Sequence, residues 1–338
     1  MEKMLAPLSN DQRKYLIDSA QVYESYLEAY RQAANYRYGM SWKKSNGKSY
    51  LFRASGRDGN GKSLGPKSSE TEQIFSEFHV AKTRNDERLQ SITARLNEFA
   101  RINKALRLGR LPTVVAKLMR NLDELGMLGE EFMVLGTQCL FAYEAAAGVR
   151  IDPSLTASGD VDLMFDARKR ITIASRKLDG EGLIGLLRKI DKTFAPMQMN
   201  TFRAANAQEF MVDLITPPRE MRQCEPIRLA DDDLIAVEVP GLEWLMNSPR
   251  FSAVCIGEDG WPCRMVVPDP RAFCVHKAWL SKRIDRDPIK KPRDLGQANI
   301  IRQLTQEYLP YLPFDEKVLK AFPEAVRNWR FTEGGVGG

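Results

Sequence analysis

The feature of this sequence that most constrains its fold is the alternation, over residues 131–215, of short apolar segments with helix-like ones. The strand-like segments are Glu131–Leu135, Val161–Phe165 and Phe210–Ile215, and the helix-like ones are Thr137–Ala147 and Gly180–Thr193. Such alternation predicts a small mixed β-sheet backed by helices. Because long helical patterns precede and follow this stretch, we expect an α+β protein with mostly helical regions on either side.

Two carboxylates interrupt the second strand-like segment. Asp160 and Asp162 are two positions apart, so both side chains leave the same face of a strand, opposite Val161 and Leu163. Like charges side by side on an apolar strand are costly without a counter-charge. A divalent cation with a preference for oxygen ligands, Mg²⁺ or Mn²⁺, supplies one.

A third carboxylate, Asp213, lies inside the apolar segment Phe210–Ile215. If this strand pairs beside the first, Asp213 joins the other two, and three carboxylates can hold two metal ions about 3.5–4 Å apart. Gly136 and Thr137 stand where a strand passes into a helix. Glycine lets a phosphate approach the backbone there, and a helix N-terminus favours anions.

At residues 126–216 the sequence resembles the polymerase β-like nucleotidyltransferases, which share this strand, Gly-Ser or Gly-Thr turn, helix, Asp-x-Asp strand and later single-Asp strand. It is most similar to bacterial stand-alone nucleotidyltransferase-domain proteins, which include antitoxin-neutralised toxins and abortive-infection proteins. Two differences stand out. Thr137 replaces the commoner serine, and Thr137 and Asp160 are 23 positions apart, with residues 149–158 as an apparent insertion.

The resemblance implies transfer of a nucleoside monophosphate from an NTP to an acceptor, with release of pyrophosphate. Asp160 and Asp162 would bind both metals, Asp213 would bind the metal at the acceptor hydroxyl or act as general base, and Gly136 and Thr137 would contact the terminal phosphates. The acceptor would be RNA, in particular tRNA, although a protein or a small molecule stays open. A toxin or defence role, with a cognate antitoxin, is a further implication.

The C-terminal region, residues 236–333, extends this resemblance to a substrate-binding helix pair. There Lys277 corresponds to a phosphate-contacting lysine and Asp294 to a polar group of the nucleotide pocket. Lys277 borders the apolar face of its helix, so its ammonium group can reach an adjoining cleft, whereas Lys290 is expected on the solvent side. We expect a hairpin at 251–267 and helices at about 269–286 and 290–308.

The N-terminal region, residues 1–125, carries the positive charge. It holds 22 basic and 14 acidic residues, whereas residues 126–338 hold 28 and 30. We predict helices at 8–35, 70–104 and 112–125, a hairpin within 37–55 and a glycine-rich loop at 56–66. The hairpin aromatics, which are Tyr36, Tyr38, Trp42 and Tyr50, either stack on acceptor bases or form a local core.

Residues 56–63, Gly-Arg-Asp-Gly-Asn-Gly-Lys-Ser, match the P-loop pattern. Their context argues against a P-loop, because Gly65-Pro66 follow at once and oppose helix formation. A basic loop that touches phosphate, or a plain connection, is the expected alternative.

The composition argues against two classes of protein, those held together by disulfides and those that span a membrane. Five cysteines without a CxxC pair argue against a disulfide framework, and we expect a cytoplasmic protein without membrane segments. The alternative to an enzyme is a non-catalytic module on the same fold that binds nucleic acid or a protein partner. The boundaries expected for the catalytic core are residues 126–235.

Overall fold

The computed structural model describes residues 4–56, 59–168, 171–178, 180–219, 225–315 and 318–327. The chain divides into two compact units, a smaller unit of residues 17–102 and a larger unit of residues 1–16 and 103–338. No helix in the described ranges is both long enough and apolar enough to cross a membrane. The functional boundaries near residues 125 and 235 stay predictions.

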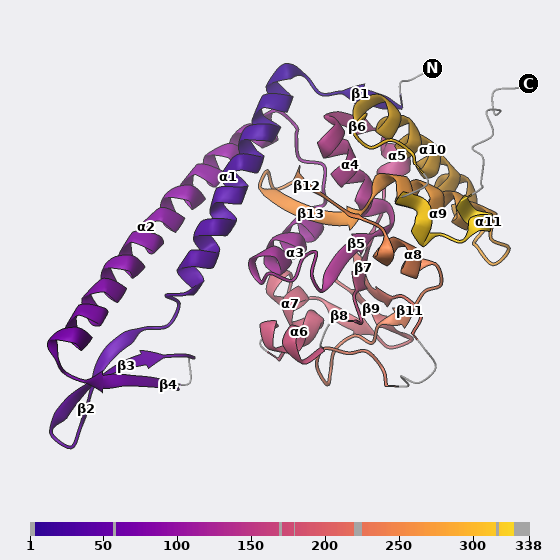
Figure 1. Ribbon diagram of the computed structural model, residues 1–338. Coiled ribbons are helices and arrows are strands. Elements are labelled where there is room, and N and C mark those ends of the chain that lie inside the picture. The colour runs from indigo at the N-terminus through magenta and orange to yellow at the C-terminus, as the bar shows by residue number, and fades with distance from the viewer. Residues whose placement is uncertain are drawn as a thin grey trace, which may run out of the picture. The chain divides into compact units, whose positions relative to one another are not determined.

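Two long helices and a three-stranded sheet make up most of the smaller unit (Figure 1). Helix α1 spans Asn10–Ala34 and helix α2 spans Ser69–Ala105, which confirms both predicted helices. Arg88 on α2 donates hydrogen bonds to Glu28 and Gln32 on α1, at 3.0 and 2.9 Å. The two helices therefore lie side by side.

The sheet of the smaller unit confirms the predicted hairpin and adds a strand. Strands β2 (Met40–Ser45) and β3 (Lys48–Ala54) are antiparallel, and the turn residues Asn46 and Gly47 both have positive φ, 48° and 75°. This is the backbone that a two-residue hairpin turn requires. Strand β4 (Gly61–Pro66) then pairs with β3.

Strand β4 replaces the second half of the loop expected at 56–66. Glycine and proline are poor strand formers, so the local sequence favours a loop, but pairing with β3 overrides that preference. Lys62 and Ser63 thus lie on a strand and not at the start of a helix, which excludes the P-loop geometry. Arg57 and Asp58 of the same motif lie outside the described residues.

The larger unit mixes helices with separate sheets, which confirms the α+β class. In chain order its elements are β1 (Leu5–Pro7), α3 (Thr113–Glu124), β5 (Phe132–Leu135), the 3-10 turn η1 (Gly136–Gln138), α4 (Cys139–Ala147), β6 (Val149–Ile151), α5 (Pro153–Thr156), β7 (Asp160–Phe165), α6 (Ile171–Lys177), α7 (Gly182–Ile190), β8 (Ala195–Met197), β9 (Asn200–Ala205), β10 (Met211–Thr216), β11 (Val237–Glu238), α8 (Leu242–Asn247), β12 (Arg250–Ile256), β13 (Pro262–Pro268), α9 (Pro270–Lys282), α10 (Lys290–Tyr308), the 3-10 turn η2 (Val318–Ala321) and α11 (Glu324–Arg327). The strands and helices predicted for residues 131–215, the hairpin and the last two long helices are confirmed. The sequence did not predict α6, β8 and β9. The apparent insertion at 149–158 forms β6, which pairs with β1, and α5.

The central sheet has the order β5-β7-β10-β9-β8, and β11 pairs with β10. Strands β7 and β10 are parallel, whereas β5 runs antiparallel to β7. One face of the sheet is buried in the main apolar cluster through Val134, Val161, Leu163 and Leu214. The opposite face carries the aspartates, so the alternation predicted for β7 is confirmed.

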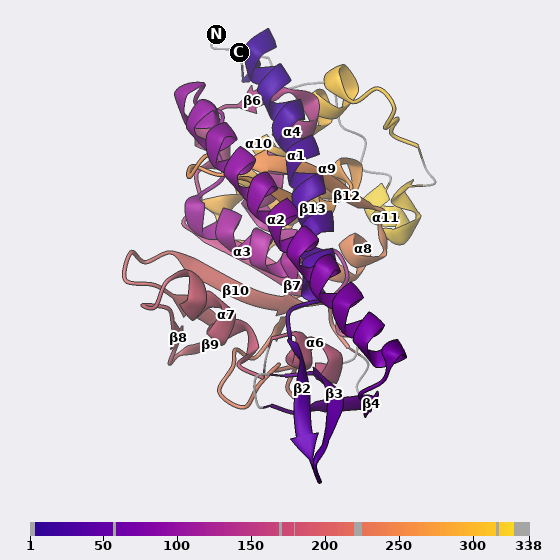
Figure 2. The ribbon, with the colours of Figure 1, turned by 90° about the vertical axis from the view of Figure 1, so that its left-hand side faces the viewer.

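The C-terminal hairpin and helices complete the larger unit. In Figures 1 and 2, strand β13 lies between α4 and α3, and it contacts both helices as well as β5. Helix α9 packs along α10, which in turn contacts α4. This arrangement brings the helix pair to the end of the sheet where α4 begins.

Candidate active site

A row of four residues crosses the sheet on the face opposite the core. Leu135 of β5 is paired with Asp162 of β7, Asp162 with Asp213 of β10, and Asp213 with Arg203 of β9. Residues directly opposite one another in neighbouring strands share a face, and neighbouring strands are about 4.8 Å apart. The structure therefore brings Asp162 and Asp213 side by side, as the sequence suggested.

Asp160 belongs to the same face, two positions before Asp162 on β7. It is paired with Met211 of β10, and its carboxylate accepts a hydrogen bond from the hydroxyl of Ser158. The amide of Gln138, in the turn after β5, donates to the backbone carbonyl of Asp160 at 2.9 Å. The turn η1 is thereby fixed against the start of β7.

Gly136 lies directly against the carboxylate of Asp162. Its φ is +67°, and a Cβ atom built on it would lie 2.1 Å from Oδ2 of Asp162. Any side chain at this position would displace the carboxylate. The predicted Gly136–Thr137 turn and the predicted Asp pair thus adjoin in space.

The carboxylates act on one another electrostatically. Burial first, and then the negative charges of Asp160 and Asp213, raise the pKa of Asp162 to about 6, against the lowering effect of Lys277 and Lys290. Three carboxylates and two lysines therefore share one electrostatic environment. This set joins residues from the sheet with residues from α9 and α10.

Arg203 is a site residue that sequence reasoning missed. Its Nε and Nη2 atoms donate to the two carboxylate oxygens of Asp213, both at 2.6 Å, and this hydrogen bonding raises the pKa of Arg203. A bidentate pair of this kind is among the stronger charge-assisted interactions. The available signal was an arginine in the segment before Asp213, but β9, Asn-Thr-Phe-Arg-Ala-Ala, lacks the apolar run by which β5, β7 and β10 are recognised.

The carboxylates of this face fit a divalent metal in part. Within the described ranges, no group of three or more histidine, cysteine or acidic side chains has the geometry to hold a metal ion. Asp213 accepts hydrogen bonds from Arg203 through both of its oxygens, so a cation there would share the carboxylate with the arginine. Asp160 and Asp162 do fit, since they are adjacent oxygen donors whose mutual repulsion a cation would relieve.

Lys277 and Asp294 form an ion pair, with 2.8 Å between Nζ and Oδ1. Both side chains are buried, and Arg286 binds the second oxygen of Asp294 at 2.7 Å. Burial opposes the ionisation of Asp294, but Lys277 and Arg286 outweigh it and hold its pKa below the ordinary value. The ammonium group of Lys277 is held by Asp294, and its predicted contact with a phosphate stays a prediction.

Thr137 is linked to α10. The amide of Gln297 donates to the hydroxyl of Thr137 at 3.2 Å and to the carbonyl of Leu155 at 2.8 Å. Gln297 is fully buried, and its Oε1 has no hydrogen-bond partner among the described residues. Helix α10 therefore contacts both predicted sets of nucleotide-binding residues: Asp294 pairs with Lys277, and Gln297 donates to Thr137.

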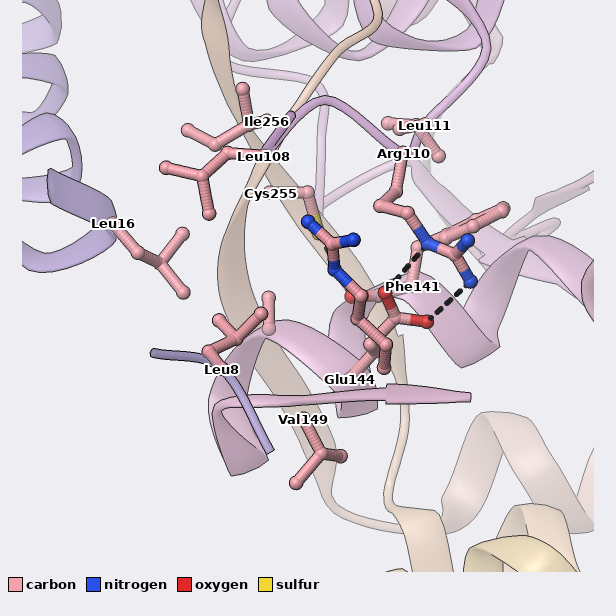
Figure 3. Close-up of a pocket in the computed structure, with 12 residues that line it drawn as sticks. Leu8, Leu16, Leu108, Arg110, Leu111, Phe141, Glu144, Val149, Cys255 and Ile256 are labelled. Atoms are coloured by element: carbon pink, nitrogen blue, oxygen red, sulfur yellow. Dashed lines mark hydrogen bonds and ion pairs between the residues drawn. The ribbon is translucent and has the colours of Figure 1, made fainter. Parts of the chain in front are cut away.

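Two hollows of the larger unit are lined by other residues. Figure 3 shows the smaller, of about 30 Å³, where Leu8, Leu108 and Phe141 surround the ion pair of Arg110 with Glu144. A nucleotide needs a pocket of several hundred Å³, so this cavity is too small for one. The larger, open hollow of about 730 Å³ lies beside α7, and Asp160, Asp162 and Asp213 line neither.

One family model, described as a nucleotidyltransferase, matches residues 113–323. The matched range begins at the first residue of α3 and contains the whole central sheet, β12, β13, α9 and α10. It covers well over half of the chain. No curated protein and no solved structure matches the chain.

The contact at Gly136 predicts a specific steric cost. Alanine at a left-handed position costs about 1–2 kcal/mol, and Gly136→Ala adds a clash with Asp162 that should cost about 1–3 kcal/mol more. Gly126→Ala is the matched control, since Gly126 has φ +63° with nothing within 4 Å of its Cβ position. Urea unfolding of both variants measures the difference. Equal losses of stability would show that Gly136 does not contact the carboxylate.

The raised pKa of Asp162 predicts how stability depends on pH without metal. The folded state favours the neutral form of the Asp162 carboxyl group. Its contribution to the free energy of unfolding is therefore complete below about pH 4 and is lost as the pH rises to about 6. In EDTA, the free energy of unfolding of Asp162→Asn should therefore increase relative to that of the wild type by up to about 3 kcal/mol over this pH range. Asp166→Asn is the control with the opposite expected pH dependence, because Arg168 lowers the pKa of Asp166 against the effect of burial. A pH-independent difference for Asp162→Asn would contradict the assignment.

The pairing of Arg203 with Asp213 predicts a metal-dependent rescue. Arg203→Met leaves a buried carboxylate without its partner, which should cost about 1–3 kcal/mol in EDTA. Mg²⁺ should restore most of that stability, because a cation at the three aspartates replaces the lost charge. Arg168→Met is the control, since Arg168 also holds a carboxylate, Asp166, with two bonds of 2.8 Å. Thermal unfolding that shows the same response to Mg²⁺ in both variants would contradict this account.

Proposed function

Because this chain belongs to the nucleotidyltransferase family, we propose that it transfers a nucleoside monophosphate from an NTP to an acceptor hydroxyl, using the aspartate face of its central sheet. The pyrophosphate group leaves. The proposal places the chain in the polymerase β-like group, on the basis of its mixed sheet with β5 antiparallel and β10 parallel to the Asp-x-Asp strand.

One observation carries this proposal. Asp162 lies beside Asp213 in register, and Gly136 lies against the carboxylate of Asp162. The turn proposed to bind phosphates is thus adjacent to the carboxylates proposed to bind the metal. Nucleotidyl transfer needs these two elements together, because the triphosphate and its counter-charge must occupy one place.

Asp160 and Asp162 would hold Mg²⁺ or Mn²⁺, which offsets the negative charge of the triphosphate when it is bound. The backbone of Gly136 and the hydroxyl of Thr137 would bind the terminal phosphates. Gln297 would orient that hydroxyl through its 3.2 Å hydrogen bond.

Asp213 would receive the proton of the acceptor hydroxyl as its oxygen attacks the α-phosphorus and the bond to pyrophosphate breaks. Both oxygens of Asp213 accept from Arg203, and each keeps a further lone pair that can receive the proton. Arg203 thereby orients the carboxylate of Asp213.

Lys277 would supply positive charge to the triphosphate. It is buried with Asp294 and acts on Asp162 from α9. Arg286 keeps Asp294 partly neutralised, so Lys277 retains positive charge toward the carboxylates. Lys290 is exposed, as predicted, but it also acts on Asp162 and is a second candidate for a phosphate contact.

RNA, in particular tRNA, is the acceptor that the excess of basic residues in positions 1–125 favours. A protein or small-molecule acceptor is the competing proposal. The similarity to toxin-like stand-alone enzymes supports a toxin or defence role in the cytoplasm, restrained by a cognate antitoxin.

The second candidate is a non-catalytic module on this fold that binds nucleic acid or a protein partner. The pairing of Arg203 with Asp213 favours it, because that arginine already neutralises the third carboxylate. A protein that had lost its metal would keep such an internal counter-charge and still bind through its basic surface.

Incubation with each α-labelled NTP, Mg²⁺, total RNA and total protein separates these two functions. With the wild type we expect label in one acceptor pool. With Asp160→Asn we expect a rate at least about 100-fold lower, where each tenfold in rate corresponds to ~1.4 kcal/mol. Asp152→Asn, a change at a half-buried helix cap outside the row, is the control for an aspartate substitution. Label transfer that survives in Asp160→Asn would falsify the catalytic assignment.

A further inference from the structure

The positive charge of the smaller unit is concentrated in its sheet. Residues 37–67 contain eight basic residues and one acidic residue, whereas the rest of this unit, residues 17–36 and 68–102, contains six and nine. The helices of the unit are thus net acidic. Figure 1 shows strands β2, β3 and β4 together at one end of the α1–α2 pair.

The two faces of this sheet differ in their side chains. One face packs on α2: Trp42 packs against Phe75 with tilted rings, and Met40 and Leu51 are buried with Phe78. Tyr36 also packs on Phe78, with 5.3 Å between ring centroids. Tyr36 and Trp42 therefore belong to a local core, which supports that alternative for these two aromatics.

The other face, which we call the outer face, carries Lys43, Lys48, Tyr50 and Phe52. The register pairs Lys43 with Tyr50, and Lys48 and Phe52 lie two positions to either side of Tyr50, so all four share this face. Both lysines are exposed, and the two rings are half-buried. Lys43 lies over the ring of Phe52, 3.4 Å from its centroid. Within residues 4–56 and 59–168, no carboxylate pairs with Lys43 or Lys48.

We propose that the outer face binds single-stranded RNA, with a base stacked on Tyr50 and phosphates held by Lys43 and Lys48. Aromatic rings beside unpaired lysines provide the two interactions that single strands use, and an acidic peptide would engage only the lysines. The inference rests on the proposed RNA acceptor, and it gives that acceptor a surface distinct from the nucleotide site.

Binding of a labelled, mixed-sequence RNA of about 12 nucleotides to the full-length chain tests this inference. The Asp160→Asn variant is used without NTP, so that binding is measured independently of transfer. Lys43→Ala with Lys48→Ala should weaken binding and lower the log–log salt slope by ~0.7 per lost phosphate contact. Arg84→Ala with Arg101→Ala is the control, because it removes the same charge from exposed positions on α2.

A second pair of variants tests stacking without relying on a disruptive change. Tyr50→Phe keeps the ring and should bind like the reference, whereas Tyr50→Leu keeps an apolar contact and should bind roughly 5- to 100-fold more weakly. Melting temperatures confirm that both are folded. Equal binding by these two variants, equal effects of the two double variants, or equally tight binding of polyglutamate or duplex RNA would overturn the inference. Label transfer in the wild type alongside such a result would leave the proposed function intact.

Discussion

Repulsion among Asp160, Asp162 and Asp213 is the interaction around which the rest of the larger unit is arranged. The sheet register places these carboxylates on one face, and the pKa of Asp162 is raised by its burial and then by the charges of Asp160 and Asp213. Arg203 compensates it from β9, and Lys277 compensates it from α9. A folded protein keeps an arrangement that costs stability when function requires it.

The positive charges that offset this repulsion come from two different elements, strand β9 and helix α9. Arg203 binds Asp213 within the sheet, whereas Lys277 belongs to a buried group with Asp294 and Arg286. Helix α10 carries both Asp294 and Gln297, and Gln297 reaches the turn at Thr137. The C-terminal helices are therefore part of the proposed nucleotide site and not only a support for the sheet.

Strong local patterns could be read from the sequence, and contacts between distant short elements could not. The Asp160–Asp162 spacing predicted a shared face, and the family match confirms the nucleotidyltransferase resemblance that these residues suggested. Arg203 escaped notice because β8 and β9 are stabilised by pairing and not by local propensity. Lys277 was placed on the correct helix, but its burial with Asp294 depends on the packing of α9 on α10. The roles of all these residues in catalysis stay predictions.

The central claim is that the aspartate face binds the metal and the triphosphate together. Its most direct test is a crystal structure of the full-length chain with Mn²⁺ and a non-hydrolysable NTP analogue, with anomalous scattering measured at the manganese edge. The account predicts an anomalous peak between the carboxylates of Asp160 and Asp162, with the terminal phosphates at Gly136 and Thr137. A bound nucleotide elsewhere, or one bound here without manganese between these two aspartates, would contradict it.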